Sequence, residues 1–413
     1  MVYFKKILLI LSIAVIFVGC GSSSTTEKIL QDENASSSDK QTDKPLQTPL
    51  GEEQIFSEVY LEMPKSDPCE DGEFYRLKTK ECLVIKNPSS GFEGWGFQGF
   101  VSAENNYTIS TLTERELKDV IANLPAEGGR IIIPEGIIEI VDGITIPSNV
   151  ILEGAGAGKT ILSNRSSDAS KFTSVVELDG ENIIIRGMTI EGNGESLNGI
   201  DGHKSGRNVL IEFIEARNFK LDQGSGISFS RKYPLYNSKI TIRYNNLYNG
   251  LHGIGVKIRT GARMLIYSNQ AFNNTNYGID ISTTQYVEVA GNYLHNNEEG
   301  GAKSPHSNAI IYHRNDINFN KVAGIAYMGR SDSATITLEE NNLSNNEGLA
   351  FNASSAYFYK LTLKNNIVTN SIDQNGYTIG AYGVRLIWVS GDHGNIWYNK
   401  AAGYRVVNAD EVE

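Results

Sequence analysis

The chain has 413 residues, of which 37 are Lys or Arg and 48 are Asp or Glu, so its formal net charge is −11. This balance excludes a generic nucleic-acid-binding protein, because such proteins present a basic surface to the phosphates. Glycine is frequent, with 41 residues, and proline is sparse, with 10, a turn-rich composition that disfavours a helical bundle. Three cysteines are too few for a disulfide scaffold.

The N-terminus has the pattern of an export signal. Lys5-Lys6 precedes an apolar run from Ile7 to Val18, and small residues follow that run. The tetrapeptide Phe17-Val18-Gly19-Cys20 resembles a bacterial lipobox, which implies that Cys20 is lipidated and becomes the mature N-terminus. We therefore predict a lipoprotein signal peptide over residues 1–20. The mature protein would be lipid-anchored in the bacterial cell envelope, at the outer membrane or the cell surface, and would meet the membrane only through its lipid.

The next part of the chain is polar and then reaches the two remaining cysteines. Residues 21–64 lack hydrophobic periodicity, which predicts a disordered tether. Cys69 and Cys82 would lie in an oxidising compartment, and closing the loop between them would be worth about 3 kcal/mol. We predict a small disulfide module over residues 65–100. A metal site is not expected, because two thiolates without a nearby His or third Cys do not supply four ligands.

The segment before the repeats predicts a helix that covers the end of a solenoid. From Thr113 to Leu124, apolar residues recur at the spacing of an amphipathic helix, and Thr113 is a suitable N-cap. Short β-branched segments follow it, beginning at Ile131. We place the main domain at residues 101–413, with this helix as its N-terminal cap.

From about residue 180 the sequence repeats. In each unit an alternating apolar segment is followed by Asn, at intervals of 24, 23, 23, 26 and 25 residues, and the positions are Asn245, Asn269, Asn292, Asn315, Asn341 and Asn366. Short strands of period two, turn residues and a repeat near 24 residues predict an all-β, single-stranded, right-handed parallel β-helix. Equivalent residues of successive coils then form ladders about 4.8 Å apart, and the repeated Asn residues are assigned a structural role.

Strand alternation predicts which side chains leave the core. In Gly253–Arg259 the β-branched residues point inward, so Lys257 and Arg259 point outward. The same register exposes residues of neighbouring coils, and these are Asp201, His203, Ser228, Ser230, Lys232, Asp280 and Ser282. His252 and Tyr277 each stand directly before the glycine of their coil, so we expect them on adjacent rungs.

The charge distribution indicates an anionic ligand. The 57 residues between Asp222 and Asp280 contain no Asp or Glu, and they carry Arg231, Lys232, Lys239, Arg243, Lys257, Arg259 and Arg263. On one concave face these cations would attract a polyanion. For an exported β-helix we expect an acidic polysaccharide, in particular a uronate polymer. Arg231, Lys232, Arg243, Asp201 and His203 are the predicted substrate-binding residues.

Chemistry on a uronate starts with removal of the proton at C5, which is very weakly acidic. The enzyme must neutralise the adjacent carboxylate and hold a base at C5. Lys257 and Arg259 suit the first task, with Asp280 sharing a proton with the carboxylate or holding a cation. Tyr277 and His252 suit the second as base and acid, provided that surrounding cations lower the pKa of the tyrosine from about 10. Reprotonation from the opposite face inverts C5, whereas loss of the O4 substituent cleaves the chain.

The predicted β-helix portion, roughly residues 101–413, resembles a known enzyme family. Pro134-Glu-Gly136, Val150–Gly156 and Met188–Asn193 are similar to turns in the catalytic module of mannuronan C5-epimerases and the related β-helical alginate and pectate lyases. Those epimerases carry a Tyr-Gly-Phe-Asp-Pro-His signature. Tyr277-Gly278-Ile279-Asp280-Ile281-Ser282 matches its Tyr, Gly and Asp, but not its Pro or His. The resemblance implies an epimerase or lyase acting on an alginate-like polymer.

Two other functions remain open. Leu251–Gly255 and Val256–Thr260 resemble fragments of polygalacturonase motifs, but Asp201 and Asp280 stand three coils apart, about 14 Å, and inverting hydrolases need about 6.5–9.5 Å. A non-catalytic glycan-binding surface protein is the second alternative. We expect a monomer that binds no nucleic acid. No cofactor is required by the sequence, and calcium dependence is left open.

Overall fold

The computed structural model describes part of the chain. The described residues are 61–70, 73–84, 97, 105–166, 174–204, 207–231, 238–258, 262–282, 286–304, 309–328, 330–353, 357–371, 379–382, 384–388, 396–397 and 404–407. The predicted signal peptide with Cys20, almost all of the predicted tether, and Lys232 and Arg259 lie outside this part. Among the described residues, no helix is both long and apolar enough to cross a membrane.

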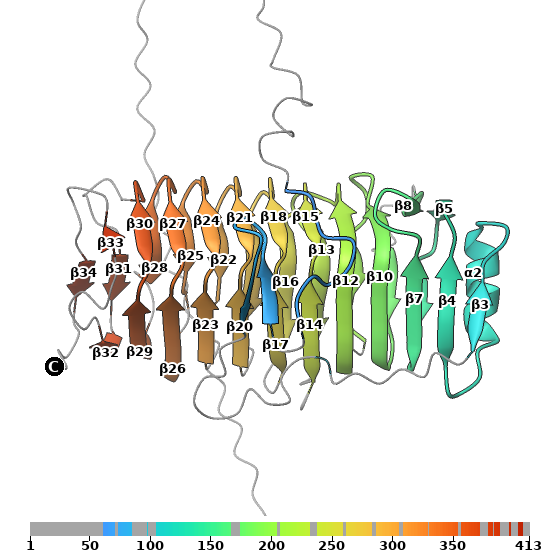
Figure 1. The fold of residues 1–413 in the computed structure, drawn as a ribbon, viewed down its shortest axis with the longest axis horizontal. Coiled ribbons are helices and arrows are strands. Elements are labelled where there is room, and N and C mark those ends of the chain that lie inside the picture. Colours follow the sequence, from blue (N-terminus) through green and yellow to red (C-terminus); the bar gives the residue numbers. More distant parts are fainter. Residues whose placement is uncertain are drawn as a thin grey trace, which may run out of the picture. The chain divides into compact units, whose positions relative to one another are not determined.

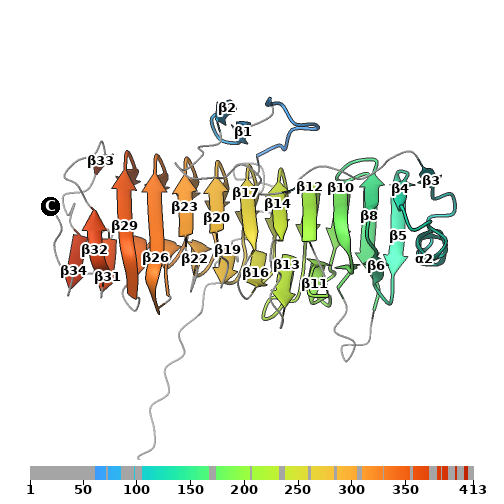
Figure 2. The ribbon, with the colours of Figure 1, turned by 90° about the horizontal axis from the view of Figure 1, so that it is seen from below.

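The described chain winds through three parallel sheets, one strand per sheet in each coil (Figures 1 and 2). The first sheet contains β3 (Asn106–Thr108), β4 (Gly129–Ile133), β7 (Val150–Gly154), the starts of β10 (Glu181–Glu191) and β12 (Arg207–Arg217), β14 (Lys239–Arg243), β17 (Arg263–Tyr267), β20 (Tyr286–Ala290), β23 (Ala309–His313), β26 (Arg330–Glu339), β29 (Tyr357–Lys364) and β32 (Val384–Trp388).

The second sheet follows within the same coils. It contains β5 (Gly136–Ile140), β8 (Thr160–Asn164), the ends of β10 and β12, β15 (Asn246–Tyr248), β18 (Gln270–Phe272), β21 (Tyr293–His295), β24 (Asp316–Asn318), β27 (Asn342–Ser344), β30 (Ile367–Thr369) and β33 (Ile396–Trp397).

The third sheet completes each coil and carries the candidate site. It contains β6 (Ile144–Ile146), β9 (Val176–Leu178), β11 (Asn198–Asp201), β13 (Ser225–Arg231), β16 (His252–Ile258), β19 (Tyr277–Ser282), β22 (Gly300–Lys303), β25 (Ala323–Ala326), β28 (Leu349–Ala353), β31 (Ile379–Tyr382) and β34 (Tyr404–Val407). Its inward positions are apolar: Ile227, Ile254 and Ile279 are in register and fully buried. The predicted parallel β-helix is therefore confirmed.

The cap helix is also confirmed. Helix α2 (Glu114–Ala122) begins after the predicted N-cap, where the Thr113 hydroxyl accepts a hydrogen bond from the Glu116 amide. Leu117 is fully buried against the first coils. The helix therefore covers the apolar end of the solenoid, next to its first described coils.

The repeated Asn residues hold consecutive coils together from inside. The Asn292 amide donates to Ile266 O and Asn315 Oδ1, and its own Oδ1 accepts from the backbone and side-chain amides of Asn269. A second internal ladder runs through Asn274, Asn297, Asn320, Asn346 and Ser371. The Asn residues four positions after the first ladder, such as Asn273, adopt positive φ near 50–55° at the turn into the third sheet. The Asn repeats thus serve the backbone and not the chemistry.

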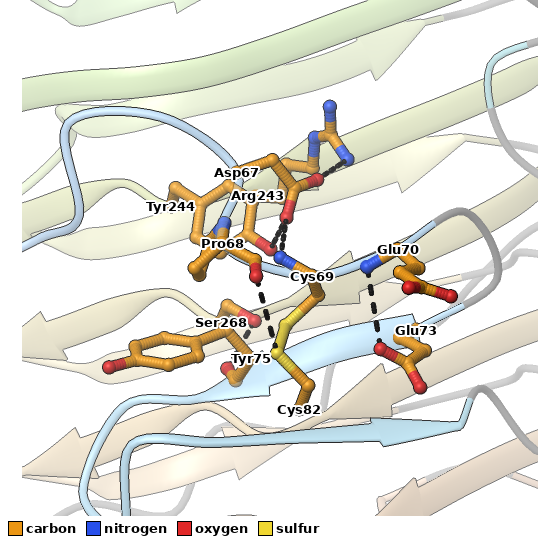
Figure 3. The surroundings of a disulfide bond; sticks show 10 residues. All are labelled: Asp67, Pro68, Cys69, Glu70, Glu73, Tyr75, Cys82, Arg243, Tyr244 and Ser268. Carbon is orange, nitrogen blue, oxygen red and sulfur yellow. Dashed lines mark hydrogen bonds and ion pairs between the residues drawn. A yellow bond between two sulfur atoms is a disulfide. The ribbon is translucent and has the colours of Figure 1, made fainter.

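The cysteine segment packs on the first sheet. Strands β1 (Glu73–Arg76) and β2 (Glu81–Val84) form an antiparallel hairpin, and a disulfide joins Cys69 to Cys82 (Figure 3). Phe74 is fully buried in a cluster with Tyr244 and Tyr267. Figure 2 shows the hairpin on the side of β17 and β20, away from β16 and β19. The third sheet is therefore not covered by this hairpin.

Candidate functional site

The third sheet brings the outward residues of five coils into one row. Strand pairing aligns Asp201, Ser228, Gly255, Asp280 and Lys303 across β11, β13, β16, β19 and β22. Three positions earlier, Ser225 pairs with His252, and Tyr277 pairs with Gly300. The register that aligns Gly255 with Asp280 also sets His252 and Tyr277 on adjacent rungs. The structure thus brings His252, Lys257, Tyr277 and Asp280 together on one sheet.

His252 lies at the centre of this group. Its Nε2 is 3.4 Å from Asp280 Oδ2, and its Nδ1 is 3.3 Å from Ser225 Oγ. All three side chains are buried, with His252 only 5% exposed. Neighbouring strands of a parallel sheet are about 4.8 Å apart. The side chains of Ser225, His252 and Asp280 can therefore contact one another only because these residues lie on consecutive coils.

Lys303 completes the group and was missed by the sequence analysis. Its Nζ is 3.8 Å from Asp280 Oδ2 and 5.2 Å from the centre of the Tyr277 ring. The acid-free stretch ends at Asp280, so this pattern does not include Lys303 in the next coil. Lys303 is two residues after Gly301, just as Asp280 is two residues after Gly278. This shared spacing indicates that Lys303 lies beside Asp280, as the strand pairing shows.

The pKa values of His252 and Tyr277 are shifted in opposite directions. Burial, with the charges of Lys257 and Lys303, lowers the pKa of His252 to about 3. Burial, with the acidic groups Glu299 and Asp280, raises the pKa of Tyr277 to about 12. The condition set for Tyr277 as the base, that cations lower its pKa, is not met, because desolvation of the phenolate dominates. At neutral pH the His252 imidazole is therefore neutral and the Tyr277 phenol is protonated.

The pKa of the Asp280 carboxyl group is also shifted from its ordinary value. Burial raises its pKa, while Lys303, Lys257 and a hydrogen bond from Ser282 act in the opposite direction. A buried carboxyl beside two ammonium groups can hold or release a proton when an anionic ligand arrives.

A pocket of about 380 Å³ extends from His252 toward the N-terminal coils. It is lined by Glu177, Leu197, Asn198, Asp201, His203, Gln223, Ser225, Ser228, Leu251, His252, Gly255 and Lys257. At its far end Asp201 is 3.2 Å from His203 Nδ1, and burial raises the pKa of Asp201. Glu177, on the adjacent rung, forms a 2.6 Å ion pair with Lys204. The pocket is within the size range of ligand sites, roughly 300–1,000 Å³.

Arg243, a predicted substrate-binding residue, lies apart from this group. It is on β14 in the first sheet, where its guanidinium contacts Asp67 at 2.6 Å (Figure 3). It also contacts Glu212 at 2.7 Å. The acid-free stretch spans more than two coils, so its cations are distributed over different sheets. Lys239 and Arg263 also lie in the first sheet, and Lys257 lies in the third. The cations therefore do not form the single predicted face.

The structure describes the remaining predicted residues only in part. Arg231 is in β13, aligned with Ile258, and Lys232 and Arg259 lie outside the described residues. Within the described part of the chain, one trio of metal-ligand side chains lies within mutual reach, Cys69, Glu73 and Cys82, and its two sulfurs are joined in the disulfide.

Comparison with known proteins identifies the fold family. Mannuronan C5-epimerase AlgE2 of Azotobacter vinelandii is 26% identical over 216 residues, which are 46% of this chain and 21% of that protein. AlgE6 of the same organism is 28% identical over 180 residues, 38% of this chain and 20% of that protein. The matches thus span about a fifth of the length of these curated relatives. The solved A-module of A. vinelandii mannuronan C-5 epimerase AlgE4 covers 72% of this chain and 90% of its own, at 18% identity and a TM-score of 0.49.

The model of the right-handed β-helix region matches residues 174–337 and 234–410, more than half of the chain. The chain therefore belongs to the right-handed β-helix family.

Proposed function

We propose that this protein modifies an acidic polysaccharide, a uronate polymer of the alginate type, by removing the proton at C5. The observation that carries the proposal is the group of His252, Tyr277, Asp280, Lys257 and Lys303 on the outer face of the third sheet. This group combines a neutral base, a protonated acid and two cations in one place. Those are the components that C5 chemistry needs.

Charge neutralisation is the first requirement. Removing the C5 proton moves negative charge into the neighbouring carboxylate, so the barrier falls when cations face that group. Lys257 is exposed and Lys303 partly exposed beside the buried Asp280. The two ammonium groups would pair with the substrate carboxylate, and Asp280, whose pKa is raised by burial, would share a proton with it.

Proton transfer is the second requirement. His252 stays neutral well below pH 7, so it can accept the C5 proton, and Tyr277 keeps its phenolic proton at neutral pH. Donation from Tyr277 to C5 on the opposite face would give the epimer. Donation to the O4 leaving group would give β-elimination. The pocket from Lys257 to Asp201 would hold adjacent sugar residues, with Asp201 and His203 at its far end.

The proposal is tested by incubating the protein with polymannuronate, alginate and polygalacturonate. Deuterium entering C5 from heavy water reports proton removal, and ultraviolet absorbance of an unsaturated uronate separates elimination from epimerisation. We expect turnover of at least one polymer. His252→Ala, Tyr277→Phe and Lys257→Ala should each lower it by about 10²-fold or more. Lys239→Ala is the matched control, since Lys239 lies in the first sheet, and should retain turnover.

Glycoside hydrolysis is a second candidate because Glu177 and Asp201 occupy adjacent rungs in the same pocket. Burial raises the pKa of Asp201, which suits an acid, while Lys204 pairs with Glu177. Reducing ends without C5 exchange or ultraviolet absorbance, abolished by Glu177→Gln, would support this function instead. Retention of the polymer without any product, weakened by Lys257→Ala, would indicate a glycan-binding protein.

The proposed location is the cell envelope, through lipidation of Cys20. Radiolabelled palmitate incorporated by the native protein and absent from Cys20→Ser tests this proposal.

A further inference from the structure

Ser225, His252 and Asp280 stand in the order of a hydrolytic triad, on three consecutive rungs. The Ser225 hydroxyl is 3.3 Å from His252 Nδ1, and Asp280 is 3.4 Å from Nε2. A nucleophilic serine needs donors for the oxyanion that it creates. The Ser225 amide already donates to Leu197 O and Asn198 Oδ1. The serine is thus better suited to bind the imidazole than to attack a substrate.

The surroundings of the two ring nitrogens differ. Nε2 faces Asp280, whose pKa is raised by burial, and the positive charges of Lys257 and Lys303 act on the ring from β16 and β22. The two cations oppose additional positive charge on the ring, and a carboxyl group with a raised pKa favours a proton on Nε2 less than an ordinary carboxylate would. From β13 the ring is faced by the uncharged Ser225, so a proton on Nδ1 finds an acceptor there.

A second polar group lies against the same ring. Asn276, directly before Tyr277, acts on His252 in the sense that raises its pKa. Its side chain is a hydrogen-bond partner of the His252 ring, and a positively charged imidazole would strengthen that bond.

We propose that Ser225 is a positioning residue that holds the proton of His252 on Nδ1, so that Nε2 is the nitrogen that takes the C5 proton. This inference rests on the proposed function. When C5 gives its proton to Nε2, the ring becomes an imidazolium with two N–H donors. Nδ1–H remains bonded to Ser225 Oγ, and the new Nε2–H faces an oxygen of Asp280, which accepts whether or not that carboxyl is protonated. Asn276 Oδ1 adds a favourable dipole.

The packing around Ser225 supports this assignment. A methyl group at Gly255, on the next rung, would lie 2.8 Å from Ser225 Oγ and 3.6 Å from His252 Nδ1. Gly255 does not adopt a positive φ, so the close approach of the hydroxyl explains the glycine. Gly255→Ala should therefore displace the Ser225 hydroxyl without removing it.

The test uses the full chain, labelled with ¹⁵N-histidine, because nitrogen shifts distinguish the two neutral tautomers without substrate. We expect wild-type His252 to carry its proton on Nδ1. Ser225→Ala and Gly255→Ala should populate the other tautomer, and Ser225→Thr should restore the wild-type spectrum. Ser344→Ala, which removes a hydroxyl bonded to Asn318 in the second sheet, is the matched control.

Kinetics provide the second readout. Ser225→Ala should lower kcat about tenfold with KM little changed, and Ser225→Thr should recover it. A wild-type proton on Nε2, or a Ser225→Ala protein with unchanged tautomer and kcat, would overturn the inference. If no polymer is turned over, the proposed function fails, but the tautomer spectrum still decides whether Ser225 holds the Nδ1 proton.

Discussion

The carboxylate of Asp67 accepts hydrogen bonds from both Arg243 and Tyr244, each at 2.6 Å, and so fastens the disulfide segment to the first sheet (Figure 3). Arg243 is also paired with Glu212 and hydrogen-bonded to Tyr267. One arginine thus links the N-terminal segment to three consecutive coils. The contact shows that a cation of the acid-free stretch is paired with two carboxylates of this chain.

Removing this carboxylate should destabilise the protein without affecting the site. Asp67→Ala leaves the Tyr244 hydroxyl without its acceptor and Arg243 with one anionic partner fewer, which should cost about 1.5–3 kcal/mol. Urea denaturation followed by fluorescence measures this change. Glu70→Ala, an exposed carboxylate of the same segment, is the control and should cost less than about 0.5 kcal/mol. Equal losses in the two variants would show that the Asp67 contact contributes nothing specific.

The internal Asn ladder should be sensitive to a single substitution. Asn292→Ala removes the acceptor of two Asn269 amides and leaves Ile266 O without a donor, so we expect a loss of roughly 3 kcal/mol. Asn273→Gly is the control, because Gly tolerates the φ of 52° at that turn and should change stability by only a few tenths of a kcal/mol. Thermal and urea unfolding compare the two. A cost for Asn292→Ala as small as that of the control would contradict the structural role of the ladder.

His252 should make the folded protein less stable in acid. Its pKa is about 3 when folded and about 6.5 when unfolded, so between these values the unfolded chain binds the extra proton. The contribution is present above pH 6.5 and is lost as pH falls, by up to about 1.4 kcal/mol per pH unit. His252→Gln should lose less stability than the wild type between pH 7 and pH 5. Asp201 and Asp280, with raised pKa values, act in the opposite direction, and both proteins retain them.

Urea denaturation at the two pH values provides the comparison, and His203→Gln is the control because His203 is exposed. Parallel losses in the wild type and His252→Gln would mean that the buried imidazole titrates normally.

The sequence by itself determined the coil. Period-two apolar segments, the 23–26-residue Asn spacing and the capped helix from Thr113 predict the β-helix and the alignment of His252, Tyr277 and Asp280, because residues at one repeat spacing must stack. The tertiary structure decided what each charge faces. Arg243 forms an ion pair with Asp67 of the N-terminal segment, and Lys303 forms one with Asp280. The sequence repeat does not predict these contacts, because they depend on the sheet in which each residue lies and on the distant segment that packs over it. Burial, which no local pattern encodes, lowers the pKa of His252 and raises that of Tyr277, and the proposed function assigns their roles accordingly.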